Sequence, residues 1–246
     1  KVKFRNGVVS EHDVDKYEQY INRLAFLTEN PTSCLFGAKL LVLENRHGFA
    51  YALWRGIMRV TTEYVLVAQH DRDFRRPVCI SSVIHALDMH KNSEDPISYI
   101  GFPTSTTLGY DRKTAGRPGL KGLMLERTPI EVVGDRPAAK NKNNCDDEPM
   151  PVSSTADGKC PIHDEGVAEK NTKSTLSLLP LVQFYDSMHL ARTHWYLSRI
   201  YGTQRFCTLP RGCFIESPLG QFMFTKACGG GIDAVKKFGC YILDDA

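Results

Sequence analysis

The chain has 246 residues, a formal net charge of +3 and an ordinary balance of apolar and charged residues. This length is enough for one large domain or two small domains with a substantial core. The small net charge does not indicate a nucleic-acid partner, and no apolar run is long enough to span a bilayer. The sequence shows no signal-type start and no Asn-x-Ser/Thr acceptor, and its eight cysteines form no Cys-x-x-Cys pair. These absences favour a cytoplasmic location and reduced thiols.

The first part of the chain predicts two helices and two strands. Ser10 and Asp13 resemble a capping box, and apolar residues at helical spacing then predict a helix over about 11–27. The apolar run 38–43 predicts a buried strand, 49–60 an amphipathic helix, and 64–68 a second buried strand. This order predicts a β-α-β unit with parallel strands and a right-handed crossover.

Alternation of helices and strands continues towards the C-terminus. We predict a helix after Pro77, a strand over 97–102, a loop over 103–128, and a mobile insertion at about 137–173, which has almost no large apolar residues. A strand over 176–184 comes next, then a helix capped by Asp186 or Ser187 and extending to about Tyr201. Glycines 229–231 predict a flexible loop, and 240–243 a last strand. The fold class is therefore α/β, in one domain spanning 1–246.

Two acids directly follow the predicted strand 64–68. Asp71 and Asp73 are separated by one residue, and ligands of α/β sheets bind at the carboxyl ends of strands. Two carboxylates there can hold a hard cation together with phosphates bound to it. The alternative is that both are solvated turn residues.

Order and spacing of these segments resemble the nucleotide-sugar-dependent glycosyltransferases of the GT-A fold, family 2. The segment from Asn45 to Gly56 is similar to the family's N-x-G-x-x-x-A motif, and Asp71-Arg72-Asp73 is similar to its D-x-D. Phe214-Ile215-Glu216 looks like the family's "xED" segment, with Ser217 in place of the second acid. The resemblance covers about 38–102 and 176–221. It implies a Rossmann-like, mostly parallel sheet flanked by helices.

The resemblance also implies an activity and a set of site residues. Asp71 and Asp73 would bind Mn²⁺ or Mg²⁺ and, with Asn45, Gly48 and Arg55, the UDP- or GDP-hexose donor. Glu216 would be the catalytic base that activates the hydroxyl acceptor, in a transfer that inverts configuration.

Three further residues are weaker candidates for acceptor binding. Asp186 and His189 follow a predicted strand end, but a helix cap and a core-edge imidazole are the alternatives. Trp195 offers a sugar-stacking surface, but an aromatic residue on an amphipathic helix is more often part of the core.

Some features depart from the family pattern. Its opening strand has no counterpart before Ser10, so we expect a fragment or a divergent member that lacks the first strand or strands. No histidine lies beyond His194 to act as a late metal ligand, and Ser217 removes the second acid beside Glu216. The main hypothesis is a metal-dependent glycosyltransferase. The alternatives are a catalytically inactive GT-A-like binding or scaffold module, and a Mg²⁺-assisted phosphoryl-transfer enzyme, although no phosphate loop is present.

Overall fold

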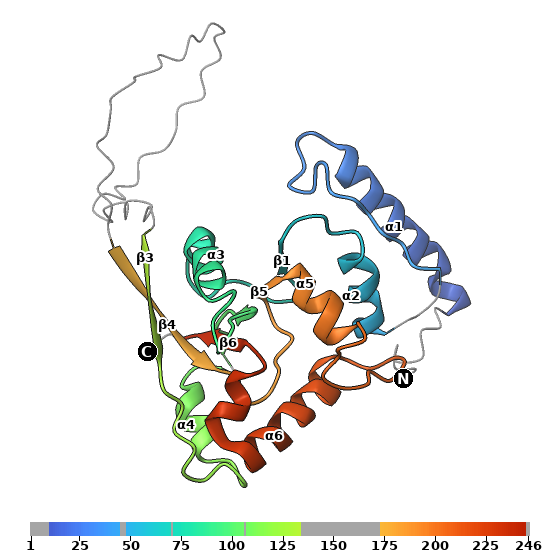
Figure 1. The fold of residues 1–246 in the computed structure, drawn as a ribbon. Helices are drawn as coiled ribbons and strands as arrows, with labels where there is room; N and C mark the ends of the chain where they lie inside the picture. Colours follow the sequence, from blue (N-terminus) through green and yellow to red (C-terminus); the bar gives the residue numbers. More distant parts are fainter. Residues whose placement is uncertain (1–9, 45–47, 70, 106, 134–172, 245–246) are drawn as a thin grey trace, which may run out of the picture.

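The computed structural model describes residues 10–44, 48–69, 71–105, 107–133 and 173–244, and the predicted insertion falls almost entirely outside these ranges. A mixed sheet lies at the centre, with helices on both sides (Figure 1). The helical elements are η2 (Glu11–Asp13), α1 (Val14–Glu29), α2 (Phe49–Ile57), α3 (Ile80–Met89), α4 (Tyr110–Ala115), α5 (Thr193–Trp195), η3 (Tyr196–Ile200) and α6 (Glu216–Lys236). The strands are β1 (Tyr64–Val67), β2 (Tyr99–Gly101), β3 (Thr128–Val133), β4 (Lys173–Pro180), β5 (His189–Arg192) and β6 (Cys240–Leu243).

The described strands form one six-stranded sheet in the order β1-β5-β2-β6-β4-β3. β2 and β6 pair in parallel, and the other four pairings are antiparallel. The α/β class is therefore confirmed, whereas the expected mostly parallel pairing is not found. Because β5 is antiparallel to both of its neighbours, β1, β2 and β6 still run in the same direction.

Both faces of the central strands are buried. Along β6, Cys240 and Ile242 belong to one apolar cluster, whereas Tyr241 and Leu243 belong to the other. The first cluster includes residues of α2, α5, η3 and α6, and the second includes residues of α3. This two-sided burial explains why the sequence of β6 is continuously apolar rather than alternating.

The predicted β-α-β unit is wrong in two respects. Residues 38–43 are mostly exposed and form no strand, and within the described residues no strand pairs with them. β1 is an edge strand whose described partner, β5, is antiparallel. The helix between them is confirmed as α2, because its apolar periodicity is satisfied by packing on the sheet.

The helix predicted to begin at Asp186 or Ser187 is also wrong at its start. Residues His189–Arg192 form β5, the strand between β1 and β2, and only then does the chain turn into α5 and η3. Neither Asp186 nor Ser187 is a helix cap. Hydrogen bonds to two strands distant in sequence stabilise this extended conformation, and local propensity does not encode them.

Three smaller differences concern α4, β3 and α6. The segment 103–128, predicted as loop, contains α4 and the first residue of β3. The predicted flexible loop at 229–231 lies inside α6, which is interrupted at Gly231, where φ is +65°. The first helix is confirmed by α1, the helix after Pro77 by α3, and the strands over 97–102 and 240–243 by β2 and β6. The strand predicted over 176–184 is confirmed only to Pro180, where β4 ends, and 181–184 form no strand.

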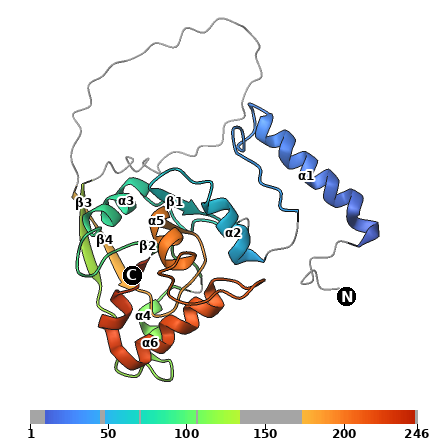
Figure 2. The same ribbon diagram turned by 45° about the vertical axis from the view of Figure 1, so that its right-hand side comes forward.

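Helix α1 stands apart from the sheet (Figure 2), and none of its residues is buried. None of the helices in the described part of the chain is long and apolar enough to cross a membrane. Because α1 contributes no buried residue, the packed core and the candidate site described next come from residues after Gly48.

Candidate functional site

Chain segments from three strands meet at one edge of the sheet. Val67, which ends β1, and Gly101, which ends β2, both lie opposite His189, which begins β5. The segments that follow β1 and β2 and the segment that precedes β5 therefore share this edge. It is the carboxyl edge of the strands that run in the same direction, the usual position of a ligand site in α/β proteins.

Two carboxyl groups from distant parts of the sequence come together at this edge. Asp186 lies three residues before β5, and Glu216 is the first residue of α6. Their carboxyl groups are close enough to interact through a side-chain hydrogen bond and through charge. The side chain of Asp186 is buried, with 8% of the residue surface exposed, and its Oδ2 atom has no hydrogen-bond partner among the described residues.

Burial is the main reason that the pKa values of both carboxyl groups are raised. For Glu216, the negative charge of Asp186 and the hydrogen bond to it act in the same direction and raise the pKa to about 7. The pKa of Asp186 is also raised by burial, although the hydrogen bond with Glu216 opposes the shift. A pair of this kind exchanges a proton near neutral pH, which is the requirement for general acid–base chemistry.

The segment after β1 provides the polar surroundings of the pair. Nε2 of Gln69 donates a hydrogen bond of 2.7 Å to the main-chain oxygen of Asp186, which ties this segment to the one before β5. The guanidinium of Arg72 lowers the pKa of both Asp186 and Glu216 through its positive charge, and so partly opposes the effect of burial. The site thus combines two carboxyl groups with one cation.

Asp71 and Asp73 lie on either side of Arg72, and both are exposed. The described residues contain no group of three or more histidine, cysteine, aspartate or glutamate side chains placed to hold a metal ion. His70 lies outside the described residues. The two aspartates therefore offer solvent-accessible carboxylates on the segment that follows β1.

The predicted donor-binding residues of the 45–55 segment are not gathered at this edge by any described contact. Asn45 lies outside the described residues, and Arg55 is exposed near the end of α2. Gly48 precedes α2 with φ of +78°, and a Cβ atom there would lie 2.5 Å from Cα of Gly212. The close approach of two backbone segments therefore explains this glycine without a nucleotide.

His189 and Trp195 have core environments. Both ring nitrogens of His189 have partners, the main-chain oxygen of Ser187 and the hydroxyl of Tyr196, and burial lowers its pKa to about 4. Trp195 is 5% exposed, and its Nε1 donates to the main-chain oxygen of Phe238 at 3.3 Å. These contacts favour a core position for both His189 and Trp195. Of the three weaker candidates, only Asp186 is a member of the carboxyl pair.

The sequence pattern identified both acids but not their pairing. Asp186 and Glu216 were separate candidates, and Ser217 suggested that the second acid was missing. The structure supplies a second carboxyl group from Asp186, while Ser217 is exposed. One signal in the sequence pointed this way, since each acid lies at the end of an apolar run: Asp186 follows 176–184 after Tyr185, and Glu216 follows 214–215. Gln69 has the same kind of position, directly after 64–68, but it was not a candidate.

Comparison of the chain with known proteins found no matching family model, no matching curated protein and no matching solved structure. The chemistry of the carboxyl pair and of the segment after β1 is therefore the basis on which a function is assigned.

Proposed function

We propose that this chain is a glycosyltransferase that moves a hexose from a nucleotide diphosphate sugar to an acceptor hydroxyl, with Glu216 as the general base. The observation that carries the proposal is the position of Glu216 beside Asp186, at the carboxyl edge of β1 and β2, with a pKa of about 7. A base with this pKa is deprotonated often enough at neutral pH to act, and is still basic enough to accept a proton.

In the proposed step, the acceptor oxygen attacks the anomeric carbon as its proton moves to the carboxylate of Glu216. The new carbon–oxygen bond forms while the bond from the anomeric carbon to the diphosphate breaks, and the nucleoside diphosphate leaves with the electron pair. A single displacement of this kind inverts the configuration of the sugar. Asp186 acts as a positioning residue, because its charge and hydrogen bond raise the pKa of Glu216 further than burial alone.

Donor binding is assigned to the segment after β1. Asp71 and Asp73 are exposed carboxylates, the ligand type that Mn²⁺ and Mg²⁺ take, and Mg²⁺ commonly binds one or two carboxylates while it keeps several waters. The bound metal would offset negative charge on the departing diphosphate. Arg72, between the two aspartates, adds a cation that can donate to phosphate oxygens.

The finer assignment of the fold to the GT-A type belongs to the same proposal. It is supported by the common direction of β1, β2 and β6, by helices on both faces of the sheet, and by the acid-bearing segment after β1. It is also supported by Asp186, which provides a carboxyl group beside Glu216 where Ser217 replaces the second acid of the motif.

The test measures release of nucleoside diphosphate and transfer of labelled hexose, from UDP- and GDP-hexoses with Mn²⁺, to a panel of hydroxyl acceptors. We expect Glu216→Gln to retain donor binding and to lose transfer by about 10²- to 10⁴-fold, the usual contribution of a general base. Ser217→Ala is the matched control, since it changes the exposed neighbouring residue, and it should keep the wild-type rate.

Two results would contradict the proposal. If Glu216→Gln and wild type transfer at the same rate, Glu216 is not the base. If the folded wild type binds a nucleotide sugar but neither transfers nor hydrolyses it, the chain is an inactive binding module. Release of inorganic phosphate without sugar transfer would instead favour the phosphoryl-transfer alternative.

A further inference from the structure

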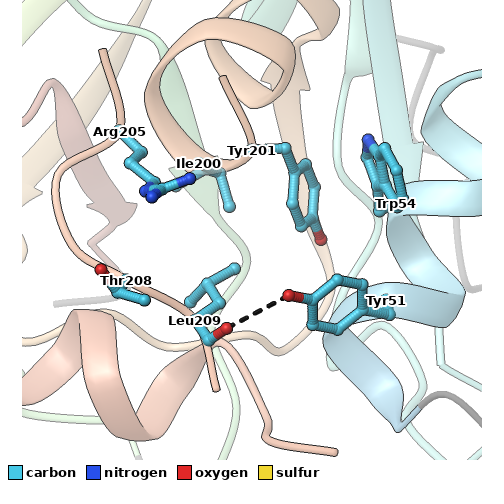
Figure 3. Close-up of a pocket in the computed structure, with 7 residues that line it drawn as sticks. All are labelled: Tyr51, Trp54, Ile200, Tyr201, Arg205, Thr208 and Leu209. Carbon is cyan, nitrogen blue, oxygen red and sulfur yellow. Dashed lines mark hydrogen bonds between the residues drawn. The ribbon is translucent and has the colours of Figure 1, made fainter. Parts of the chain in front are cut away.

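A second concave site lies between α2 and the segment that follows η3. It is a pocket of about 220 Å³. Tyr51 and Trp54 line it from α2, and the remaining lining residues are Ile200, Tyr201, Arg205, Thr208 and Leu209 (Figure 3). This volume admits at least one small ring, because about 10–15 Å³ of such space already holds a water molecule.

The aromatic walls of the pocket are held in place by hydrogen bonds across it. The hydroxyl of Tyr51 donates to the main-chain oxygen of Leu209 at 3.3 Å, as Figure 3 shows, and the hydroxyl of Tyr201 donates to the main-chain oxygen of Ala50 at 2.7 Å. Both hydroxyl protons are therefore used inside the protein, and the oxygens remain free to accept. A site whose walls are already fixed loses little entropy when a ligand enters it.

The arrangement of the rings selects against a flat ligand. Trp54 and Tyr201 are tilted by 38° with centroids 6.3 Å apart, and Tyr51 and Trp54 meet edge to face at 86°. Neither of these two pairs forms a parallel slot in which a nucleobase would stack on both sides. The lining contains no Asp, Glu, Asn or Gln side chain to pair with the edge of a base. A puckered pyranose instead presents C–H groups in several directions, and these can contact rings that are inclined to one another.

The charge of the pocket indicates an anionic ligand. Arg205 is the charged residue of the lining, is exposed, and forms no ion pair with any residue in the described part of the chain. In Figure 3 Arg205 lies across the pocket from Tyr51 and Trp54, and its guanidinium extends towards Ile200. A planar guanidinium binds a carboxylate through two parallel hydrogen bonds, which a neutral sugar cannot offer.

We propose that this pocket binds one pyranose ring that carries a carboxylate, a uronic acid residue, with the ring against Trp54 and Tyr201 and the carboxylate on Arg205. The proposal goes beyond the transfer reaction and does not depend on it. The pocket is linked to the carboxyl pair through the chain: Ala50, which accepts from Tyr201, donates to the main-chain oxygen of Cys213 at 3.2 Å, three residues before Glu216. A uronic acid bound there would also hold the segment that leads into α6.

The experiment measures binding of methyl β-D-glucuronide, methyl β-D-glucoside and UMP by calorimetry or ligand-observed NMR. We expect the glucuronide to bind at least about 5-fold more tightly than the glucoside. Trp54→Ala should weaken both sugars by about 2- to 12-fold, the range that corresponds to loss of one aromatic contact. Arg205→Gln should abolish the preference for the glucuronide while leaving the glucoside unchanged.

Control variants separate this site from the carboxyl pair. Arg59→Gln removes an exposed arginine beyond the end of α2, outside the pocket, and should bind both sugars as wild type does. Glu216→Gln should also bind them normally, so failure of the transferase proposal leaves this result unaffected. Arg205 is exposed, which makes its variant informative even if Trp54→Ala does not fold.

Three results would overturn the proposal. The first is no binding of the glucuronide by folded wild type. The second is equal binding of the glucuronide by wild type and Arg205→Gln. The third is tighter binding of UMP than of the glucuronide, lost in Trp54→Ala, which would identify a nucleotide pocket.

Discussion

Two pairs of acids in this protein have opposite environments. Asp71 and Asp73 are separated by one residue in the sequence, and both are exposed after an edge strand. Asp186 and Glu216 are separated by thirty positions, yet their carboxyl groups interact, and burial raises the pKa of each. Closeness in the sequence therefore left Asp71 and Asp73 in solvent, whereas the meeting of the segment before β5 with the start of α6 withdraws Asp186 and Glu216 from it.

The difference assigns different chemistry to the two pairs. Exposed carboxylates stay hydrated and can exchange water for a hard cation, so they suit metal and phosphate binding. Carboxyl groups withdrawn from solvent, as Asp186 is and as Glu216 is in part, retain a proton to higher pH, so they suit proton transfer. The proposed function uses both properties at one edge of the sheet. Asp71 and Asp73, which flank Arg72 in the sequence, bind metal and phosphate, and Asp186 and Glu216 serve proton transfer. Three predictions test whether this separation of roles is correct.

The largest effect is expected at the exposed pair. Asp73→Ala should weaken Mn²⁺-dependent binding of UDP or GDP by at least about 10-fold, since loss of even an outer-shell partner of a metal costs about 10- to 100-fold. Asp71→Ala should do the same. Calorimetry with Mn²⁺ and then with excess chelator measures the effect. Asp233→Ala, an exposed acid on α6, serves as control, and an unchanged metal dependence in all variants would remove the metal role.

A smaller effect is expected when the buried pair is uncoupled. Asp186→Asn removes the charge and the carboxyl hydrogen bond that raise the pKa of Glu216, while the raising effect of burial remains. Since the base must be deprotonated to act, the acidic limb of the pH–rate profile should move to lower pH, by about one unit. The pH–rate profile of Asp73→Ala, measured at saturating metal, should have an acidic limb with the same midpoint as that of wild type. A limb that stays in place in Asp186→Asn would show that Asp186 does not tune the base.

The smallest effect concerns stability. The pKa of Glu216 is about 7 in the folded protein and near its ordinary value of 4.5 in the unfolded chain. Between these values the folded state holds the extra proton, so Glu216 lowers stability progressively as pH rises from about 4.5 to 7. Glu216→Gln should therefore be more stable than wild type at pH 8 but not at pH 4.5. Partial exposure screens the interaction, so we expect a gain of about 1 kcal/mol.

Chemical denaturation at both pH values measures this difference. Burial lowers the pKa of His189, which makes the opposite contribution, because its stabilising effect is lost as pH falls from about 6.5 to 4. That contribution is common to wild type and variant and cancels in the comparison. A pH-independent difference between Glu216→Gln and wild type would contradict the raised pKa.

Periodicity predicted those elements whose own side chains supply their apolar face. The helices α1, α2 and α3 and the strands β2, β4 and β6 lie where apolar spacing placed them. The same reasoning failed for 38–43 and for β5. Residues 38–43 have the composition of a strand but no partner among the described strands. Residues His189–Arg192 lack a strand pattern but have partners on both sides.

In the candidate site, too, some features follow from local sequence order and others from contacts between distant segments. Local order along the chain predicts the α/β class, the acids after β1, and Asp186 and Glu216 as individual candidates. The three-dimensional fold, in contrast, brings Asp186 and Glu216 together, places Gln69 and Arg72 near them, and forms the pocket that Tyr51, Trp54, Tyr201 and Arg205 line. Contacts between segments far apart in the sequence, and the burial that raises a pKa, arise from long-range packing that local propensity does not contain.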